Sequence, residues 1–141
     1  MQHSSSILLA LFNKMQQYLK QDSNLLNIIP VLPSADINRD IAWYREKAGF
    51  EPVHFDKMYA VLYRDNLCIH LQWHADTVDD PLLGGSVIRI NVKNIKDVFD
   101  EFIKRGTVQL HNFMPNTPWG THEFGFFDLN RNGIFFMEDI E

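Results

Sequence analysis

The sequence predicts one α+β domain in which the order strand–helix–strands occurs twice. The chain has 141 residues, of which 45% are hydrophobic and 22% are charged, values typical of an ordinary globular domain. Each half contains an apolar strand pattern, a helix pattern that ends at a glycine, and further strands joined by turn residues. We expect a helical extension over 1–24 and a single domain over 25–141, with half-units of about 25–80 and 84–141.

Residues 4–21 are expected to form an amphipathic helix. Serines at its start can cap the first turn, and large apolar side chains recur at helical spacing. These side chains are Ile7, Leu8, Leu11, Phe12, Met15 and Leu19. We expect this added helix to pack on the domain or on a second subunit. No basic residue precedes the apolar run and no small-residue cleavage site follows it, which argues against a signal peptide.

The first half-unit begins with an apolar strand over 26–32. Ser34 and Asp36 can each cap the helix that follows, and Gly49 is placed where a left-handed helix end is expected. The buried face of this helix is predicted from Ile37, Ile41, Tyr44 and Ala48. Two more strands are expected over 58–64 and 67–74.

The turn between those two strands is Asp65-Asn66. Both residues tolerate positive φ, so the pair suits a tight hairpin. The polar residues 76–81 then form a connector to the second half-unit.

The second half-unit repeats this order, beginning with a strand over 86–92. Apolar residues alternate there with Arg89 and Asn91, which is the period of a strand with two different faces. Asn94 can cap the next helix, and Gly106 can end it. Its apolar face is formed by Ile95, Val98, Phe99 and Phe102.

Three further strands are expected after this helix. They cover 108–113, 123–127 and 134–138, and the turn 128–133 joins the last two. The architecture therefore repeats within the chain, although the residue identities do not.

Charge and cysteine content exclude several classes of function. The formal net charge is −5 and no basic run occurs, so we expect no nucleic-acid partner. Cys68 is the only cysteine, which excludes a disulfide within the chain and a cysteine-based zinc site, and favours the cytoplasm. No stretch approaches the ~20 apolar residues of a membrane span.

Two segments resemble motifs of bleomycin resistance proteins. The first is Ile29-Pro30-Val31-Leu32-Pro33, and the second is Pro118-Trp119-Gly120-Thr121-His122-Glu123-Phe124-Gly125, followed by Asp128-Leu129-Asn130-Arg131-Asn132. The likeness extends over about 28–138. In the last turn, Leu129 and Arg131 replace a usual proline and glycine, so the hairpin there can differ by a residue.

The wider group is the glyoxalase, bleomycin resistance and dioxygenase superfamily, also called the vicinal oxygen chelate proteins. The resemblance implies paired βαβββ modules that form a curved mixed sheet around a cleft. It also implies a homodimer whose clefts use both chains.

Metal-dependent members of that superfamily place ligands at four equivalent strand positions. Matched motif to motif, these positions are Ile29, His70, Val87 and Phe135, and three of them carry hydrocarbon side chains that cannot coordinate a metal. His74 does not help, because on a strand it lies about 13 Å from His70. We therefore expect no metal and no cofactor.

Strand alternation predicts two walls of the cleft. Cys68, His70 and Gln72 line one wall, while their neighbours pack against helices. Arg89 and Asn91 line the facing strand. Arg89 needs a partner there, which is either an internal carboxylate such as Glu123 or a polar ligand; we favour the internal pair.

Aromatic residues complete the predicted site. Phe55, Tyr59 and Trp119 lie in segments where bleomycin resistance proteins present aromatic surfaces to the drug, and His54 occupies the place of another such aromatic. These rings suit a planar ligand. The alternative is that they fill the core or the dimer interface.

The leading hypothesis is a binding protein that sequesters an aromatic or cationic small molecule, possibly a glycopeptide antibiotic, in a dimer cleft without catalysis. The alternative is a metal-dependent lyase, isomerase or dioxygenase of the same superfamily. A third hypothesis is an interaction or regulatory module that assembles through the helix at 4–21.

Overall fold

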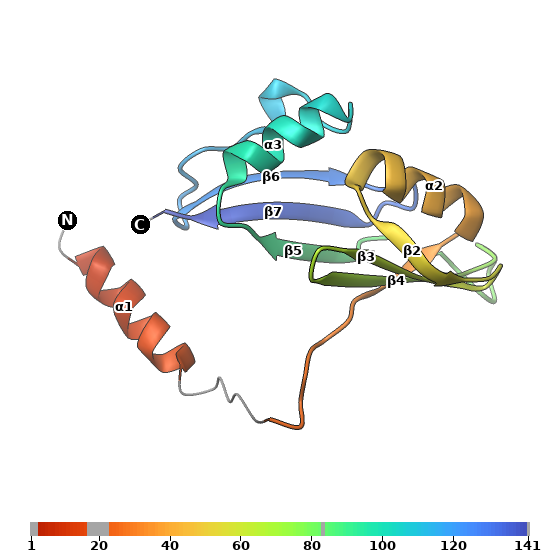
Figure 1. Ribbon diagram of the computed structural model, residues 1–141, viewed down its shortest axis with the longest axis horizontal. Coiled ribbons are helices and arrows are strands. Elements are labelled where there is room, and N and C mark those ends of the chain that lie inside the picture. The colour runs from red at the N-terminus through yellow and green to blue at the C-terminus, as the bar shows by residue number, and fades with distance from the viewer. Residues whose placement is uncertain (1–2, 17–22, 83, 141) are drawn as a thin grey trace.

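The computed structural model describes residues 3–16, 23–82 and 84–140, and it confirms the predicted α+β class (Figure 1). Its strands form a four-stranded sheet in the order β1-β4-β3-β2 and a three-stranded sheet in the order β5-β7-β6. The elements are α1 (His3–Gln16), β1 (Val31–Ser34), α2 (Ile37–Ala48), β2 (Glu51–Phe55), β3 (Tyr59–Arg64), β4 (Leu67–Trp73), β5 (Val87–Asn91), α3 (Ile95–Lys104), a 3-10 turn (Leu110–Asn112), β6 (Thr121–Phe127) and β7 (Gly133–Asp139).

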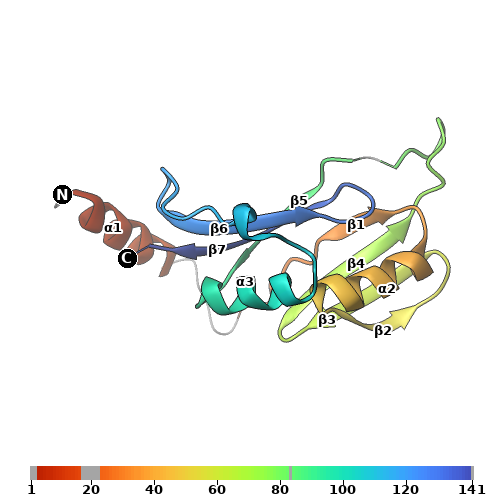
Figure 2. The same cartoon turned by 90° about the horizontal axis from the view of Figure 1, so that it is seen from above.

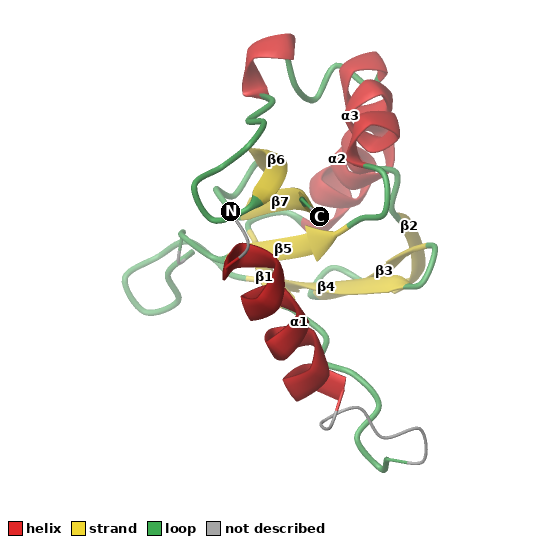
Figure 3. Cartoon of the chain, turned by 90° about the vertical axis from the view of Figure 1, so that its left-hand side faces the viewer, coloured by secondary structure: helices red, strands yellow, loops and turns green. Residues whose placement is uncertain are grey.

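Both half-units follow the same plan. The first strand of each pairs in parallel with the last strand of the same half, after crossing over through a helix: β1 with β4 and β5 with β7. The remaining pairs are antiparallel. Helix α2 packs on the first sheet and α3 on the second, which leaves the opposite face of both sheets uncovered by helices (Figures 1 and 3). We call this uncovered side the open face.

The core lies between the helices and the sheets. The predicted faces of α2 and α3 are buried there. Aromatic rings dominate the second half, where Phe102 of α3 lies 5.6 Å from Phe124 and 5.0 Å from Phe136 between ring centroids. Such ring contacts add to the free energy gained by removing apolar surface from water.

A capping hydrogen bond and a left-handed glycine fix the boundaries of α2 as the sequence predicts. Asp36 accepts a bond from the backbone N–H of Arg39 at 3.0 Å and thereby caps the helix start. Gly49 ends the helix with φ of +75°, a conformation that costs glycine little.

The carboxyl end of α2 is bound by residues of the second half-unit. Arg105 donates from Nη1 to the carbonyl oxygen of Glu46 at 3.0 Å, and Thr107 donates to the carbonyl oxygen of Lys47 at 2.5 Å. These donors satisfy carbonyl groups that a helix leaves unpaired at its end. They also join the two half-units.

A buried polar cluster joins the turn at 128–132 to β1 and α2. Asn130 donates to the carboxylate of Asp40 at 2.6 Å, and Asn132 donates to the carbonyl oxygen of Pro33 at 3.1 Å. Asn130, Asp40 and Asn132 are all at least 98% buried. Hydrogen bonds compensate these side chains for the loss of water, except at Oδ1 of Asn132, which is buried without a hydrogen-bond partner among the described residues.

One expectation for the first sheet was wrong, and one strand was missed. The first strand begins at Val31 rather than at Leu26, and the side chains of Leu26 and Ile28 are 89% and 95% exposed. Strand β2, which contains Pro52, was not among the strands predicted from the sequence pattern. Proline is tolerated here since β2 is the edge strand of its sheet.

The strand predicted over 108–113 was also wrong. Leu110–Asn112 form a 3-10 turn instead, in which Gln109 and Asn112 cap each other through side chain and backbone. Local bonds of this kind compete with strand pairing. One isolated bridge, from Met114 to Glu123, pairs the segment after this turn with β6. The second sheet therefore has three strands.

Helix α1 stands apart from both sheets in Figure 1, although in the view of Figure 2 it overlaps the end of β7. It covers 3–16, so residues 17–21 of the predicted helix lie outside the described part of the chain. Every α1 side chain that the structure describes is exposed, so α1 does not pack on its own domain. Packing on a second subunit remains a prediction. Within the described ranges, no helix is long and apolar enough to cross a bilayer.

Candidate functional site

A row of side chains crosses the open face of the first sheet. His54 pairs with Val61, Val61 with His70, and His70 with Val31. Cross-strand partners project to the same face of a sheet. Since Val31 is 46% exposed and no helix covers it, this row lies open to a ligand.

Tyr59 and His70 form a pair on this face. The Tyr59 hydroxyl lies 2.8 Å from Nδ1 of His70, and the two rings meet edge to face at 5.3 Å. The hydrogen bond fixes the orientation of the imidazole. The other ring nitrogen, Nε2, has no hydrogen bond to any described residue. Gln72 lies beside Tyr59 in the register, while Ile69 and Leu71 are buried on the helix side, as the alternation predicts.

Phe55 does not join this group. It pairs with Ala60, whose side chain is buried on the helix side of the sheet. Phe55 therefore projects to the face opposite that of His54, where it is 51% exposed at the sheet margin.

The second sheet contributes a cluster centred on Glu123. Its carboxylate is 99% buried and accepts hydrogen bonds from Thr121 and from the indole N–H of Trp119. Arg89 donates from Nη2 to the other carboxylate oxygen at 3.1 Å. The internal pair of Arg89 and Glu123 that we favoured is thus present. Thr121 was not predicted, although its position two residues before Glu123 places both on one strand face.

The charge of Glu123 is stabilised by this arrangement. Burial alone would raise the pKa of its carboxyl group, but the hydrogen bonds from Thr121, Trp119 and Arg89 outweigh burial and lower the pKa below its ordinary value. Glu123 is therefore a fixed acceptor rather than a proton donor at neutral pH.

The Trp119 side chain is fixed through its indole nitrogen, while the residue is exposed to solvent. Glu123 accepts from its N–H, yet the residue is 63% exposed. A large aromatic ring fixed at one edge offers a stacking surface at low entropic cost. Asn91 lies nearby, in register with Met137, which itself pairs with Glu123.

The positions equivalent to metal ligands do not fit a metal. In the register, His70 pairs with Val31 and Phe135 pairs with Arg89. Neither valine nor arginine is a metal ligand, so these neighbours of the matched positions do not complete a metal site. In the described part of the chain, no group of three or more His, Cys, Asp or Glu side chains could hold a metal ion.

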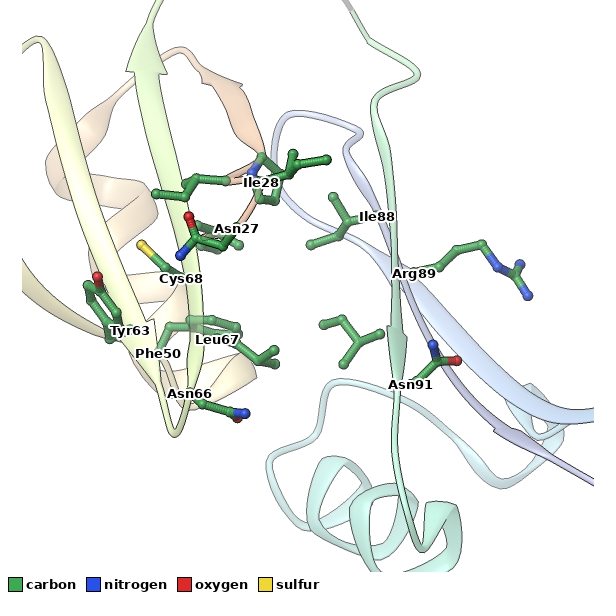
Figure 4. Close-up of a pocket in the computed structure, with 14 residues that line it drawn as sticks. Asn27, Ile28, Phe50, Tyr63, Asn66, Leu67, Cys68, Ile88, Arg89 and Asn91 are labelled. Atoms are coloured by element: carbon green, nitrogen blue, oxygen red, sulfur yellow. The ribbon is translucent and has the colours of Figure 1, made fainter. Parts of the chain in front are cut away.

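A separate pocket of about 410 Å³ lies between β4 and β5 (Figure 4). Ile88 points into it, whereas Arg89 points away from it, toward the open face. Its other walls include Ile28, Cys68 and Ile69. The predicted ligand-binding side chains other than Phe55 are distributed over the open face, and this pocket is a separate hollow whose walls include several apolar side chains.

The sequence and the fold were compared with known proteins. No family model matches the chain. Bleomycin resistance proteins of Geobacillus stearothermophilus and Staphylococcus aureus are each 28% identical over 131 residues, covering 83% of this chain and 99% of the relative.

Solved structures with the same fold have lower sequence identity. The bleomycin-binding protein of Streptomyces verticillus complexed with copper(II)-bleomycin has a TM-score of 0.66 at 19% identity, covering 81% of this chain and 96% of its own. The bleomycin resistance determinant of transposon Tn5 has a TM-score of 0.67 at 19% identity, covering 82% and 98%. A glyoxalase-related enzyme of Clostridium phytofermentans has a TM-score of 0.65 at 18% identity, covering 86% and 100%.

Proposed function

Because the chain is 28% identical to bleomycin resistance proteins and has the same fold as a bleomycin-binding protein, we propose that it belongs to the glyoxalase, bleomycin resistance and dioxygenase superfamily and binds a small molecule in the manner of bleomycin resistance proteins. The ligand is an aromatic or cationic compound, and the protein sequesters it without making or breaking a bond. Binding alone protects a cell from a toxic compound, because the concentration of free compound falls as protein takes it up.

One observation supports this proposal most strongly. The open face carries side chains fixed by hydrogen bonds, Trp119 on Glu123 and His70 on Tyr59, while three of the four positions matched to metal ligands carry hydrocarbon side chains. Fixed aromatic and polar groups lower the entropic cost of binding. The proposed binding residues are His54, Tyr59, His70, Gln72, Arg89, Asn91, Trp119 and Glu123; Phe55 is left out because it projects to the other face.

A homodimer is part of the proposal. Val31, Val87 and Phe127 of the two sheets are 46%, 58% and 65% exposed. Exposed apolar side chains of this size favour coverage by another surface. In the proposed dimer, the open faces of two chains form the walls of each binding cleft.

Enzymatic chemistry of the superfamily is not favoured. Such reactions polarise vicinal oxygen atoms on a metal ion. His70 is the only ligand-type side chain among the four matched positions, and a single imidazole does not hold a divalent metal.

Titration with bleomycin tests the proposal. We expect saturable binding with a dissociation constant on the order of micromolar or below, followed by calorimetry and by tryptophan emission. Trp43 and Trp73 pack against the core, so the emission change should come from Trp119. Trp119→Phe should remove the emission change and weaken binding, and Trp43→Phe serves as the matched control.

Two results would contradict the proposed function. The first is the absence of saturable heat with bleomycin and with other planar cationic drugs. The second is a purified protein that contains a transition metal in stoichiometric amount, which would restore the enzyme hypothesis.

A further inference from the structure

Phe135 lies flat on the open face of the second sheet. In the register it is flanked by Gly125 on β6 and Arg89 on β5. A Cβ atom added at Gly125 would overlap the Phe135 ring, and one added at Gly133 would lie 3.1 Å from its Cε2 atom. The ring therefore covers two positions that have no side chain. One of its faces rests on the backbone, and the residue is partly exposed.

Apolar side chains border this ring on one side. Gly133 lies in register between Val87 and Phe127, which are 58% and 65% exposed. Together with the Phe135 ring they form an apolar surface, which we call the apolar platform. Planar groups stack on such rings in offset or edge-on arrangements.

Arg89 stands at the opposite border of the ring. Its Nη2 atom is engaged by Glu123 and by the sulfur of Met137, both at 3.1 Å. No residue in the described ranges accepts a hydrogen bond from Nε or Nη1, and the side chain is 47% exposed. Glu123 also accepts hydrogen bonds from Thr121 and Trp119, which hold its carboxylate in place. The carboxylate in turn positions Arg89 through Nη2 and leaves the other donor groups of Arg89 available.

We propose that Phe135 and Arg89 form a subsite for a planar aromatic ring that carries a carboxylate. The ring stacks on Phe135, and the carboxylate accepts hydrogen bonds from the free donors of Arg89, which match its planar geometry. The inference rests on the proposed function only in that the open face receives a small molecule. It deepens that function by selecting an anionic group at the ring edge over a cationic one.

Three probes with one ring system and different charge test the subsite. They are naphthoate, naphthylmethanol and naphthylmethylammonium, each titrated calorimetrically into the full-length protein. We expect naphthoate to bind about tenfold more tightly than the other two, the factor that a charge-assisted hydrogen bond contributes. Equal binding of the three probes, tighter binding of the ammonium, or no binding of naphthoate would overturn the subsite.

Variants assign the preference to residues. Arg89→Gln should abolish the preference for naphthoate while it keeps the binding of naphthylmethanol, and Arg89→Lys should retain part of it. Arg45→Gln is the matched control, since Arg45 is an exposed arginine of α2 that pairs with Glu51. A preference that survives Arg89→Gln would refute the role of Arg89.

The ring is tested separately. Phe135→Leu should weaken all three probes, and Gly125→Ala should do the same by displacing the ring. Thermal unfolding of each variant identifies one that fails to fold, and the Arg89 series remains decisive in that case. Bleomycin, titrated in parallel, separates the two proposals: naphthoate binding without bleomycin binding contradicts only the proposed function, and the converse contradicts only the subsite.

Discussion

Tyr44 donates its hydroxyl proton to the carboxylate of Asp128 at 2.6 Å, across 84 residues of sequence and inside the core. Helix α2 is thereby joined to the turn between β6 and β7. Burial, together with the neighbouring charge of Asp128, raises the pKa of Tyr44 well above its ordinary value, so the hydroxyl stays a donor at every physiological pH.

Replacing Tyr44 by Phe should lower the free energy of unfolding by about 1–2 kcal/mol. The change removes one buried hydrogen bond and leaves Asp128 with its bonds to Asn130 and Asn132. Urea denaturation measures the loss. Tyr63→Phe is the control, because Tyr63 is 43% exposed and its replacement should have an effect below about 0.5 kcal/mol. Equal effects of the two changes would refute this interpretation.

Asn130→Ala should cost more, about 2–4 kcal/mol. The Asn130 side chain accepts from the backbone N–H of Ala35 at 3.0 Å and donates to Asp40, so its loss leaves the Ala35 N–H without its partner and leaves the buried Asp40 oxygen with only the hydrogen bond from Ser34. The same denaturation experiment applies. Leu129→Ala, at a neighbouring and exposed position, should change the free energy of unfolding by less than half as much.

Arg131→Gly should stabilise the protein by up to about 1 kcal/mol. Arg131 has φ of +64°, a left-handed conformation that disfavours any residue with a Cβ atom and suits glycine. Arg131→Ala keeps the Cβ atom and should give no gain. A gain from alanine equal to that from glycine would show that charge rather than backbone conformation is responsible.

Acid should remove the stabilising contribution of Glu123. The pKa of this carboxyl group is lower in the folded chain than its ordinary value of 4.5, so the contribution is complete above that value and is lost as pH falls through the folded pKa. Glu123→Gln should be less stable than the wild type at about pH 7, and the difference should shrink toward about pH 3. A difference that stays constant between these pH values would contradict the assignment.

Polar residues on α1 should reduce self-association. Leu8 and Leu11 are 50% and 52% exposed, and α1 has no buried side chain among its described residues. Replacing both by Gln should lower the fraction of dimer in sedimentation velocity while the temperature of unfolding of the domain is unchanged. Gln16→Ala is a control on the same helix. A large fall in unfolding temperature would instead show that α1 supports its own domain.

The sequence predicts the parts of this fold that local patterns determine. The α2 boundaries follow from Asp36 and Gly49, and the faces of β4 and β5 follow from alternation. The predicted hairpin at Asp65-Asn66 is present, with Asp65 at φ of +50°. The family resemblance was confirmed by the comparisons.

Features that depend on distant contacts were missed. Asp40 lies on the apolar face of α2, and a carboxylate in such a face signals a buried partner, but its partner Asn130 is 90 residues away. Phe135 was considered only as a position for a metal ligand, although Gly125 in the closing motif signals a close approach of another group. The first strand was predicted to begin too early, because the residues at 26–30 fit the apolar pattern of a strand although they are not part of the paired strand, which begins at Val31.

The bonds from Arg105 and Thr107 to the end of α2 also bear on how the chain tolerates a break. The connector around Val78, which is 98% exposed, is a natural point for proteolytic nicking. A cut there would leave these bonds, the Tyr44–Asp128 bond and the shared core intact, so the two fragments would remain associated. Each fragment alone would expose helix carbonyls and aromatic surface that the other supplies, so the halves act as complementing pieces of one cooperative unit.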